Sequence, residues 1–253
     1  HLSTLMVPKH RRAVLEEIRR RLNDGLPCRV VSTSLIEAGV DIDFPAVYRE
    51  LAGLDSILQA AGRCNREGKR AAEDSIVTIF RRTEDAPPLF KRNIRITNNA
   101  LKDNADPAAP QTIQHYFSEL RTLTGSAIDQ AGVIDAFERG RNGSLYPFRT
   151  IAENFHMIDN DPRTVYIPWK DGSELIERLC DGACSKKLYR QLGQYAVQVY
   201  DEHFQALYDA GALQTADKTN GLDDRSAVLT DASLYSEATG LSLHADSGQA
   251  LFG

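Results

Sequence analysis

The chain has 253 residues, which is enough for one large domain or two smaller ones. Its hydrophobic share of 42% and charged share of 26% are those of an ordinary globular protein. No apolar run approaches the roughly 20 residues of a membrane span, and the first residues lack the apolar core of a signal peptide. The four cysteines, at positions 28, 64, 180 and 184, are few and unevenly spaced, which favours ordinary thiols in a reducing cytoplasm over a disulfide framework or a metal site.

Charge is divided unevenly along the chain. Residues 1–82 carry 14 basic and 11 acidic side chains, a net of +3, whereas residues 83–253 carry 16 basic and 24 acidic side chains, a net of −8. The overall net charge of −5 argues against indiscriminate nucleic-acid binding. It leaves room for a local basic groove in the first third of the chain.

The first third of the chain predicts an α/β unit. Helices are expected over 11–22 and 55–66, from the spacing of their apolar residues. Short β-branched runs predict strands over 28–33, 47–51 and 75–80. The alternation of strands and helices indicates a parallel sheet that is covered on its faces.

Residues 83–111 contain four prolines and little periodicity, so we expect a linker there. Beyond it, the patterns predict a second, smaller α+β unit. Its expected helices are 112–123, 132–139, 173–180 and 201–210, and its expected strands are 148–158 and 164–169, joined by a turn over 159–163. The expected division is therefore 1–82, a linker over 83–111, and 112–253.

Residues 32–45 (STSLIEAGVDIDFP) follow a predicted strand directly. In parallel α/β sheets, ligands bind beyond the carboxyl ends of the strands, where the hydroxyl of Thr33 can meet phosphate oxygens. Gly39 permits a tight backbone path that brings Asp41 and Asp43 shortly afterwards. The alternative interpretation is a plain strand and loop.

Residues 59–70 (QAAGRCNREGKR) place a glutamine and two arginines at helical spacing. Gln59, Arg63 and Arg66 stand at i, i+4 and i+7, so on a helix they share one stripe. Two guanidinium groups on one stripe suit a polyanion such as a triphosphate, because each can bind phosphate oxygens through two hydrogen bonds.

Structural explanations of the same residues remain open. Ser56 with Gln59 fits a capping box, which would make the glutamine structural. Arg66, Lys69 and Arg70 could form a solvated basic end that the helix dipole favours.

The two segments, in this order and about 20 residues apart, resemble motifs V and VI of the second RecA-like lobe of superfamily 2 helicases. Their wording is similar to that of the CRISPR-associated helicase–nuclease of type I systems. The opening HLSTLM resembles the motif IV region, and FRTIAENFHMID, VYIPW, LYRQLGQYAV and YSEATGL resemble the accessory C-terminal domain of that family. The resemblance implies an incomplete RecA-like parallel-sheet lobe followed by the smaller α+β accessory domain.

The resemblance also implies roles for individual residues. Arg63 and Arg66 match the motif VI arginines, which reach the triphosphate of ATP and stabilise charge on the transferred phosphoryl group. Gln59 belongs to the same motif and is expected in the catalytic cleft. Asp41 matches the motif V aspartate, which contacts the nucleotide or orients the arginines.

On the nucleic-acid side, Thr33 matches the motif V threonine that touches the DNA backbone, and Ser3 and Thr4 match motif IV. Glu37 and Asp43 lie within motif V without an assigned role. No phosphate loop, DExH box or His-Asp nuclease dipeptide occurs. We therefore expect a C-terminal fragment in which the Mg²⁺ that accompanies ATP is held by an absent first lobe, and the nuclease metal by an absent domain.

The expected function is that of an ATP-dependent single-stranded DNA translocase, or helicase, and nuclease, which degrades foreign DNA in type I CRISPR interference. The CRISPR surveillance complex (Cascade) would recruit it, and the fragment would be inactive alone. A second hypothesis is a protein-docking module that uses the acidic residues 83–253. A third is a superfamily 2 helicase of repair or RNA metabolism.

Overall fold

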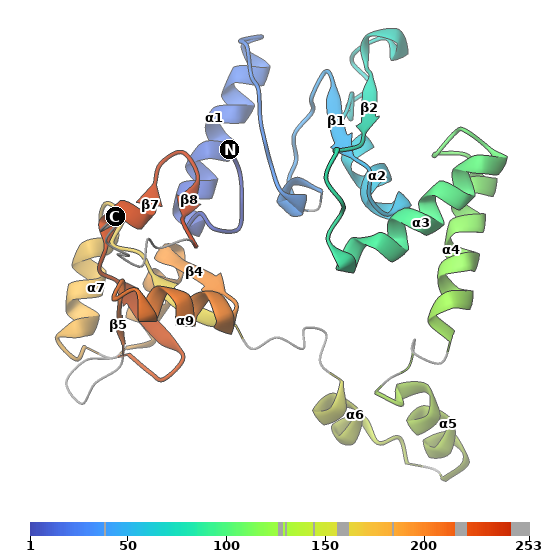
Figure 1. Cartoon of the computed structure of the whole chain (residues 1–253). Coiled ribbons are helices and arrows are strands. Elements are labelled where there is room, and N and C mark those ends of the chain that lie inside the picture. The colour runs from blue at the N-terminus through green and yellow to red at the C-terminus, as the bar shows by residue number, and fades with distance from the viewer. Residues whose placement is uncertain are drawn as a thin grey trace, which may run out of the picture. The chain divides into compact units, whose positions relative to one another are not determined.

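The computed structural model describes residues 1–37, 39–125, 129, 131–143, 145–155, 162–183, 185–215 and 222–243. The chain forms two compact units (Figure 1). Unit 1 combines His1–Ile36 with Asn160–Gly253, and unit 2 is Glu37–Asp159. This grouping by compactness differs from the expected division 1–82, 83–111 and 112–253, whose boundaries stay a prediction.

Unit 1 is built on a four-stranded mixed sheet of order β4-β3-β6-β5. Its strands are β3 (Arg163–Tyr166), β4 (Ala196–Val199), β5 (Leu213–Thr215) and β6 (Ser226–Leu229). The two central strands, β3 and β6, are parallel, and both outer pairings are antiparallel. Strand β3 confirms the strand expected over 164–169, although it ends earlier.

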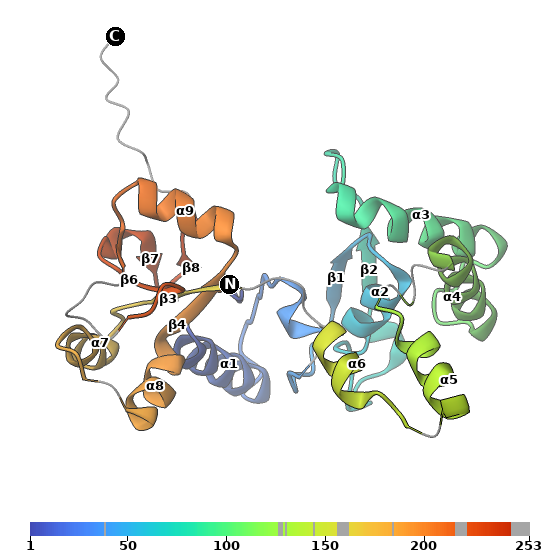
Figure 2. The same ribbon diagram turned by 90° about the horizontal axis from the view of Figure 1, so that it is seen from below.

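Both faces of this sheet are covered, and its central strand β6 is buried along its whole length, whereas β4 and β5 each carry an exposed glutamine. Val165 and Val197 lie on one face with Phe204 and Leu207 of α9 (Asp201–Asp209). Tyr166 lies on the other face, in a cluster with residues of α7 (Gly172–Cys180) and α8 (Lys186–Leu192). Figure 2 shows α9 on one side of the sheet and α7 with α8 on the other. The helices expected over 173–180 and 201–210 are thereby confirmed.

The N-terminal part of unit 1 contains α1 (Pro8–Asn23), which confirms the helix expected over 11–22. The strand expected over 28–33 is wrong. Only an isolated parallel bridge forms there, between Leu2 and Ser32. The β-branched run lacks a paired ladder, and Val31 is 72% exposed. The hairpin β7 (Tyr235–Ser236) and β8 (Gly240–Leu241) completes the unit.

Unit 2 has a two-stranded parallel sheet of β1 (Val47–Glu50) and β2 (Val77–Phe80), with Val47 opposite Val77. Helix α2 (Leu54–Ala61) lies between these strands in the sequence. The strands expected over 47–51 and 75–80 are confirmed. The remaining helices are α3 (Pro88–Asp103), α4 (Pro110–Thr124), α5 (Val133–Gly143) and α6 (Phe148–Asn154).

The linker expected over 83–111 is wrong in its local structure, because α3 occupies most of it. Pro88 and Pro110 stand in the first turns of α3 and α4, where a missing N–H costs nothing, so these prolines begin helices. Ile96 and Ala100 of α3 are buried against Tyr116 of α4.

Helices α4 and α5 confirm the helices expected over 112–123 and 132–139. The strand expected over 148–158 is wrong, because 148–154 form α6, and 156–158 lie outside the described residues, as do 159–161 of the expected turn. The mixed α/β class is confirmed. Within the described part of the chain, no helix has the length and apolarity that crossing a membrane requires.

Candidate active site

Helix α2 ends sooner than its sequence suggests, so Arg63 and Arg66 do not share a helix stripe with Gln59. The helix ends at Ala61, with Gly62 as its C-cap. Asn65 then adopts a left-handed conformation with φ 48°, which turns the chain back on itself. Gln59 remains exposed on the last turn of α2, while both arginines belong to the turn that follows.

The capping-box explanation of Gln59 is also wrong. The N-cap of α2 is Gly53, and no side chain caps the helix. Leu54, Ile57 and Ala60 form the buried side of the helix. Gln59 therefore has no role at the helix start.

Backbone hydrogen bonds join the two predicted motifs. The N–H of Phe44 donates to the carbonyl of Arg63 over 2.8 Å, and the N–H of Asn65 donates to the carbonyl of Phe44 over 2.9 Å. The Asn65 side chain closes the turn, donating to the carbonyl of Arg70 over 2.7 Å and accepting from its N–H over 3.0 Å. Residues 40–45 and 63–70 are thereby held as one layer of two loops.

Two aspartates of motif V face the arginines of motif VI. Arg66 Nη1 lies 2.7 Å from Asp41 Oδ1, in a pair whose side chains are 41% and 77% exposed. Asp43 is 12% exposed and accepts from the backbone N–H of Arg66 over 2.7 Å and from the guanidinium of Arg70 over 2.9 Å. Asp43 thus fixes the turn, while Asp41 holds the outer guanidinium. These basic residues are not a solvated helix end.

Arg63 is held from a different direction. Its Nη2 donates to the backbone carbonyl of Glu37 over 2.7 Å. The carboxylate of Glu37 lies 2.9 Å from Arg49 Nη2, on strand β1. Sequence reasoning assigned no role to Glu37 and did not consider Arg49, because nothing in the spacing links them.

The layer of the two loops 40–45 and 63–70, which we call the arginine layer, lies beside the amino ends of β1 and β2. The thiol of Cys64 lies 3.5 Å from the carbonyl oxygen of Pro45 and 3.8 Å from that of Ile76, and these two residues precede the two strands. Burial, followed by the charge of Asp43, raises the pKa of the Cys64 thiol. The loop that carries Arg63 and Arg66 thus lies near the amino ends of the two parallel strands, and not beyond their carboxyl ends, where parallel sheets usually bind ligands.

Unit 1 carries the three residues expected to face nucleic acid. The Leu2–Ser32 bridge brings their two segments together. Thr4 and Thr33 are exposed, whereas Ser3 is 3% exposed and its hydroxyl donates to the carbonyl of Thr239 over 3.4 Å. Two of the three hydroxyls therefore reach the surface, and contact with DNA stays a prediction for all of them.

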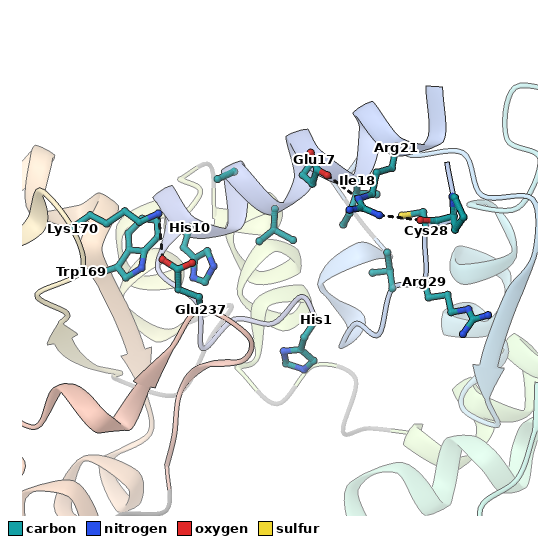
Figure 3. A pocket seen from close by; sticks show the side chains of 14 residues that line it. His1, His10, Glu17, Ile18, Arg21, Cys28, Arg29, Trp169, Lys170 and Glu237 are labelled. Carbon is teal, nitrogen blue, oxygen red and sulfur yellow. Dashed lines mark hydrogen bonds and ion pairs between the residues drawn. The ribbon is translucent and has the colours of Figure 1, made fainter. Parts of the chain in front are cut away.

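Unit 1 also contains a cavity of about 420 Å³ between α1, the segment 27–30 and Trp169 (Figure 3). Its charged lining is mixed in sign, and four of its charged residues form two ion pairs. Arg21 binds Glu17 over 2.7 Å, and Lys170 binds Glu237 over 3.3 Å. Such a lining favours no one class of charged ligand.

The site as a whole presents guanidinium groups on a layer of two loops, with one of them held by an exposed carboxylate. Exposed ion pairs contribute only about 0–1 kcal/mol, so an incoming phosphate can replace Asp41 as the partner of Arg66 at little cost. An arrangement of this kind suits transient contact with a phosphate group. Lys69 of the same turn is already paired with Glu67.

A mixed α/β chain with this pair of joined motifs is similar to the C-terminal region of a nuclease/helicase. The family model described as CRISPR-associated nuclease/helicase Cas3, C-terminal, matches residues 2–69. The Cas3 nuclease/helicase of Haloferax volcanii is 39% identical over an alignment 162 residues long, which covers 53% of this chain and 17% of that protein. That of Methanothermobacter thermautotrophicus is 33% identical over 81 residues, or 31% of this chain and 10% of that protein.

The solved structures agree on the fold. The crystal structure of T. fusca Cas3 with ATP has a TM-score of 0.53 and 15% identity, and the match covers 90% of this chain and 32% of that one. The structure of T. fusca Cas3 alone gives 0.52 over the same shares. The chain thus spans about a third or less of the proteins it matches. Its predicted resemblance to the CRISPR-associated helicase–nucleases is confirmed, and the chain is similar to the C-terminal region of Cas3.

Proposed function

We propose that these residues serve an ATP-dependent single-stranded DNA translocase and nuclease, acting against foreign DNA in type I CRISPR interference. In this proposal Arg63 and Arg66 bind the triphosphate and stabilise charge as the γ-phosphoryl group leaves. Asp41 either holds Arg66 until the nucleotide takes its place or itself contacts the ribose of the nucleotide. Gln59 lines the cleft in which the nucleotide binds. A first lobe would supply the phosphate loop and the Mg²⁺, and a separate domain would supply the nuclease metal.

The observation that carries the proposal is the layer of two loops, in which motif V carboxylates pair with motif VI arginines. Asp41 meets Arg66 at 2.7 Å, and the backbone of residue 44 bonds on both sides of Cys64. A loop pair built only for stability needs no exposed arginine held by a carboxylate that is itself 77% exposed. T. fusca Cas3 has been crystallised with ATP and with AMPPNP, which supports a nucleotide as the ligand.

The test is Arg66→Ala in the full-length enzyme that contains these residues. DNA-stimulated ATP hydrolysis should fall by about 10³- to 10⁵-fold, because a transition-state arginine is lost. The dissociation constant of the nucleotide should change little. Arg82→Ala is the matched control, because Arg82 pairs at the surface of unit 2, with Glu50 at 2.8 Å and Glu84 at 3.8 Å, and its loss should leave turnover unchanged. Normal turnover in the Arg66→Ala enzyme would exclude the assigned role.

We propose single-stranded DNA as the polymer, contacted through the exposed Thr33 and Thr4, while the buried Ser3 holds their segment through its bond to Thr239. The CRISPR surveillance complex (Cascade) is the proposed recruiting partner and the cytoplasm the proposed location. The isolated chain should bind DNA weakly and without sequence preference, because few cations meet phosphates. Thr33→Val should weaken this binding and Thr230→Val should not. Equal affinity of the two variants would remove Thr33 from the interface.

A protein-docking role is a second candidate, favoured by the net charge of −8 over residues 83–253. This role is compatible with the first, because one chain can carry both surfaces. Purified surveillance complex should retain the whole chain at low salt and release it as the salt concentration rises, and replacing acidic residues within 83–253 by their amides should weaken this retention. Absence of any association at low salt would count against docking through this half.

A further inference from the structure

The proposed function leaves one feature of unit 2 unexplained, which is a largely buried ion pair next to Arg63. Glu37 and Arg49 lie 2.9 Å apart, with side chains 9% and 25% exposed. Burying two charges is costly unless their geometry is held well, so such a pair is weak evidence for stability alone. Its neighbourhood suggests what else it does.

The pair connects Arg63 to the sheet. Arg49 lies on β1, opposite Ile79 of β2, so its backbone is fixed by the strand ladder. Its guanidinium binds the carboxylate of Glu37, and the backbone carbonyl of Glu37 accepts the hydrogen bond of Arg63 over 2.7 Å. The connection therefore runs from strand to carboxylate to carbonyl to guanidinium.

We infer that Glu37 and Arg49 are positioning residues, which hold the Arg63 guanidinium in its productive orientation for phosphoryl transfer. This inference rests on the proposed function and adds two residues to it. Arg49 Nε is buried without a hydrogen-bond partner among the described residues, so the guanidinium gives up one bond to reach Glu37. A cost of this kind is expected where a contact serves geometry.

The inference makes a quantitative prediction for Glu37→Ala in the full-length enzyme. Displacing a catalytic group by about 1 Å can cost on the order of 100-fold in rate. We expect kcat for DNA-stimulated ATP hydrolysis to fall by roughly 10- to 100-fold, with the KM for ATP changed by less than about threefold, because the lost contact matters in the transition state. Glu37→Gln, whose amide oxygen can still accept from Arg49, should recover part of the rate.

The control is an ion pair on the same strand that does not contact Arg63. Glu50 of β1 pairs with Arg82 at 2.8 Å, with side chains 34% and 45% exposed. Glu50→Ala should leave kcat within about twofold of the parent, since exposed pairs contribute little. Thermal unfolding of every variant shows which ones remain folded at the assay temperature, and Glu37→Gln serves if Glu37→Ala does not fold.

A double-mutant cycle with Arg63→Ala separates positioning from general stability. Single-turnover measurements should show that Glu37→Ala, or Glu37→Gln, slows an enzyme that contains Arg63 but not one that already carries Arg63→Ala. Equal slowing in both backgrounds would overturn the inference, and so would a raised KM with unchanged kcat. If Arg63→Ala alone leaves turnover intact, the proposed function fails instead, so the two failures are distinguishable.

Discussion

Tyr116 offers a direct test of how unit 2 holds α2, the helix that leads into the arginine layer. Tyr116 is fully buried on α4, and its hydroxyl donates to Asp55 Oδ1 in the first turn of α2 over 2.9 Å. A hydrogen bond to a charged acceptor contributes about 1.5–3 kcal/mol. Tyr116→Phe removes the bond and keeps the ring, which packs with Leu54 and Ile96. Unit 2 should therefore lose stability by that amount.

Hydrogen exchange followed by mass spectrometry measures this loss where it occurs. A loss of 1.5–3 kcal/mol corresponds to roughly 10- to 150-fold faster exchange of the protected amides of α2 and α4. Tyr48→Phe is the matched control, because Tyr48 lies on β1 of the same unit and is 73% exposed. Unchanged exchange in Tyr116→Phe, or equal acceleration in both variants, would refute the reasoning.

The same residue predicts a response to alkaline pH. Burial, and then Asp55, raise the pKa of Tyr116 above its ordinary value of about 10. Above pH 10 the unfolded chain loses this proton while the folded chain keeps it, so the unfolded state binds fewer protons and stability falls as pH rises. The fall should be smaller in Tyr116→Phe, as urea titrations at pH 9 and pH 11 will show.

Three further predictions concern unit 1 and the nucleic acid. Gly240→Ala should destabilise unit 1 by at least about 2 kcal/mol, because the φ of Gly240 is +84° and an added Cβ would lie 2.5 Å from the carbonyl oxygen of Leu5. Gly25→Ala is the control and should cost only about 1 kcal/mol, because the φ of Gly25 is +66° but no atom lies within 4 Å of an added Cβ. The unfolding of both variants in urea can be followed by the fluorescence of Trp169, the sole tryptophan. His10 is 5% exposed, and burial lowers its pKa, so below about pH 6.5 the unfolded state binds more protons than the folded state. The stability of unit 1 should therefore fall as the pH falls from 7 to 5, and His10→Gln should make this fall smaller. DNA affinity should fall linearly on a plot of log K against log salt with a slope of only a few, and a slope near zero would contradict phosphate contact.

Local chemistry in the sequence was sufficient for the parts of the fold that depend on neighbours in the chain. The apolar spacing predicted α1, and the β-branched runs predicted β1 and β2. Prolines misled the prediction over 83–111, because a proline at N1 begins a helix as readily as a proline elsewhere ends one. The strand expected over 28–33 failed because a strand needs a partner ladder, which periodicity does not supply.

The sequence predicted which side chains pair in part of the candidate site, but not the geometry that presents them, and their roles stay a prediction. Asp41 and Arg66 could be chosen from residue type and from the resemblance, and they pair in the structure. The end of α2 at Gly62 and the left-handed Asn65 changed how the arginines are presented. The contact of Arg63 with a backbone carbonyl has no signal in the sequence, because every residue has such a carbonyl.

The division of the chain has a consequence for synthesis on the ribosome. Unit 1 is made of residues 1–36, which precede unit 2 in the sequence, and of residues 160–253, which follow it. Unit 2 therefore emerges whole while α1 still waits for residues 160–253, among which Trp169 stacks on His10 of this helix, since domains fold as units in the order in which they are completed. The contacts between α1 and residues 160–253 can form only after unit 2 has been synthesised, and a chaperone or a translational pause that protects α1 until then would raise the yield of folded protein.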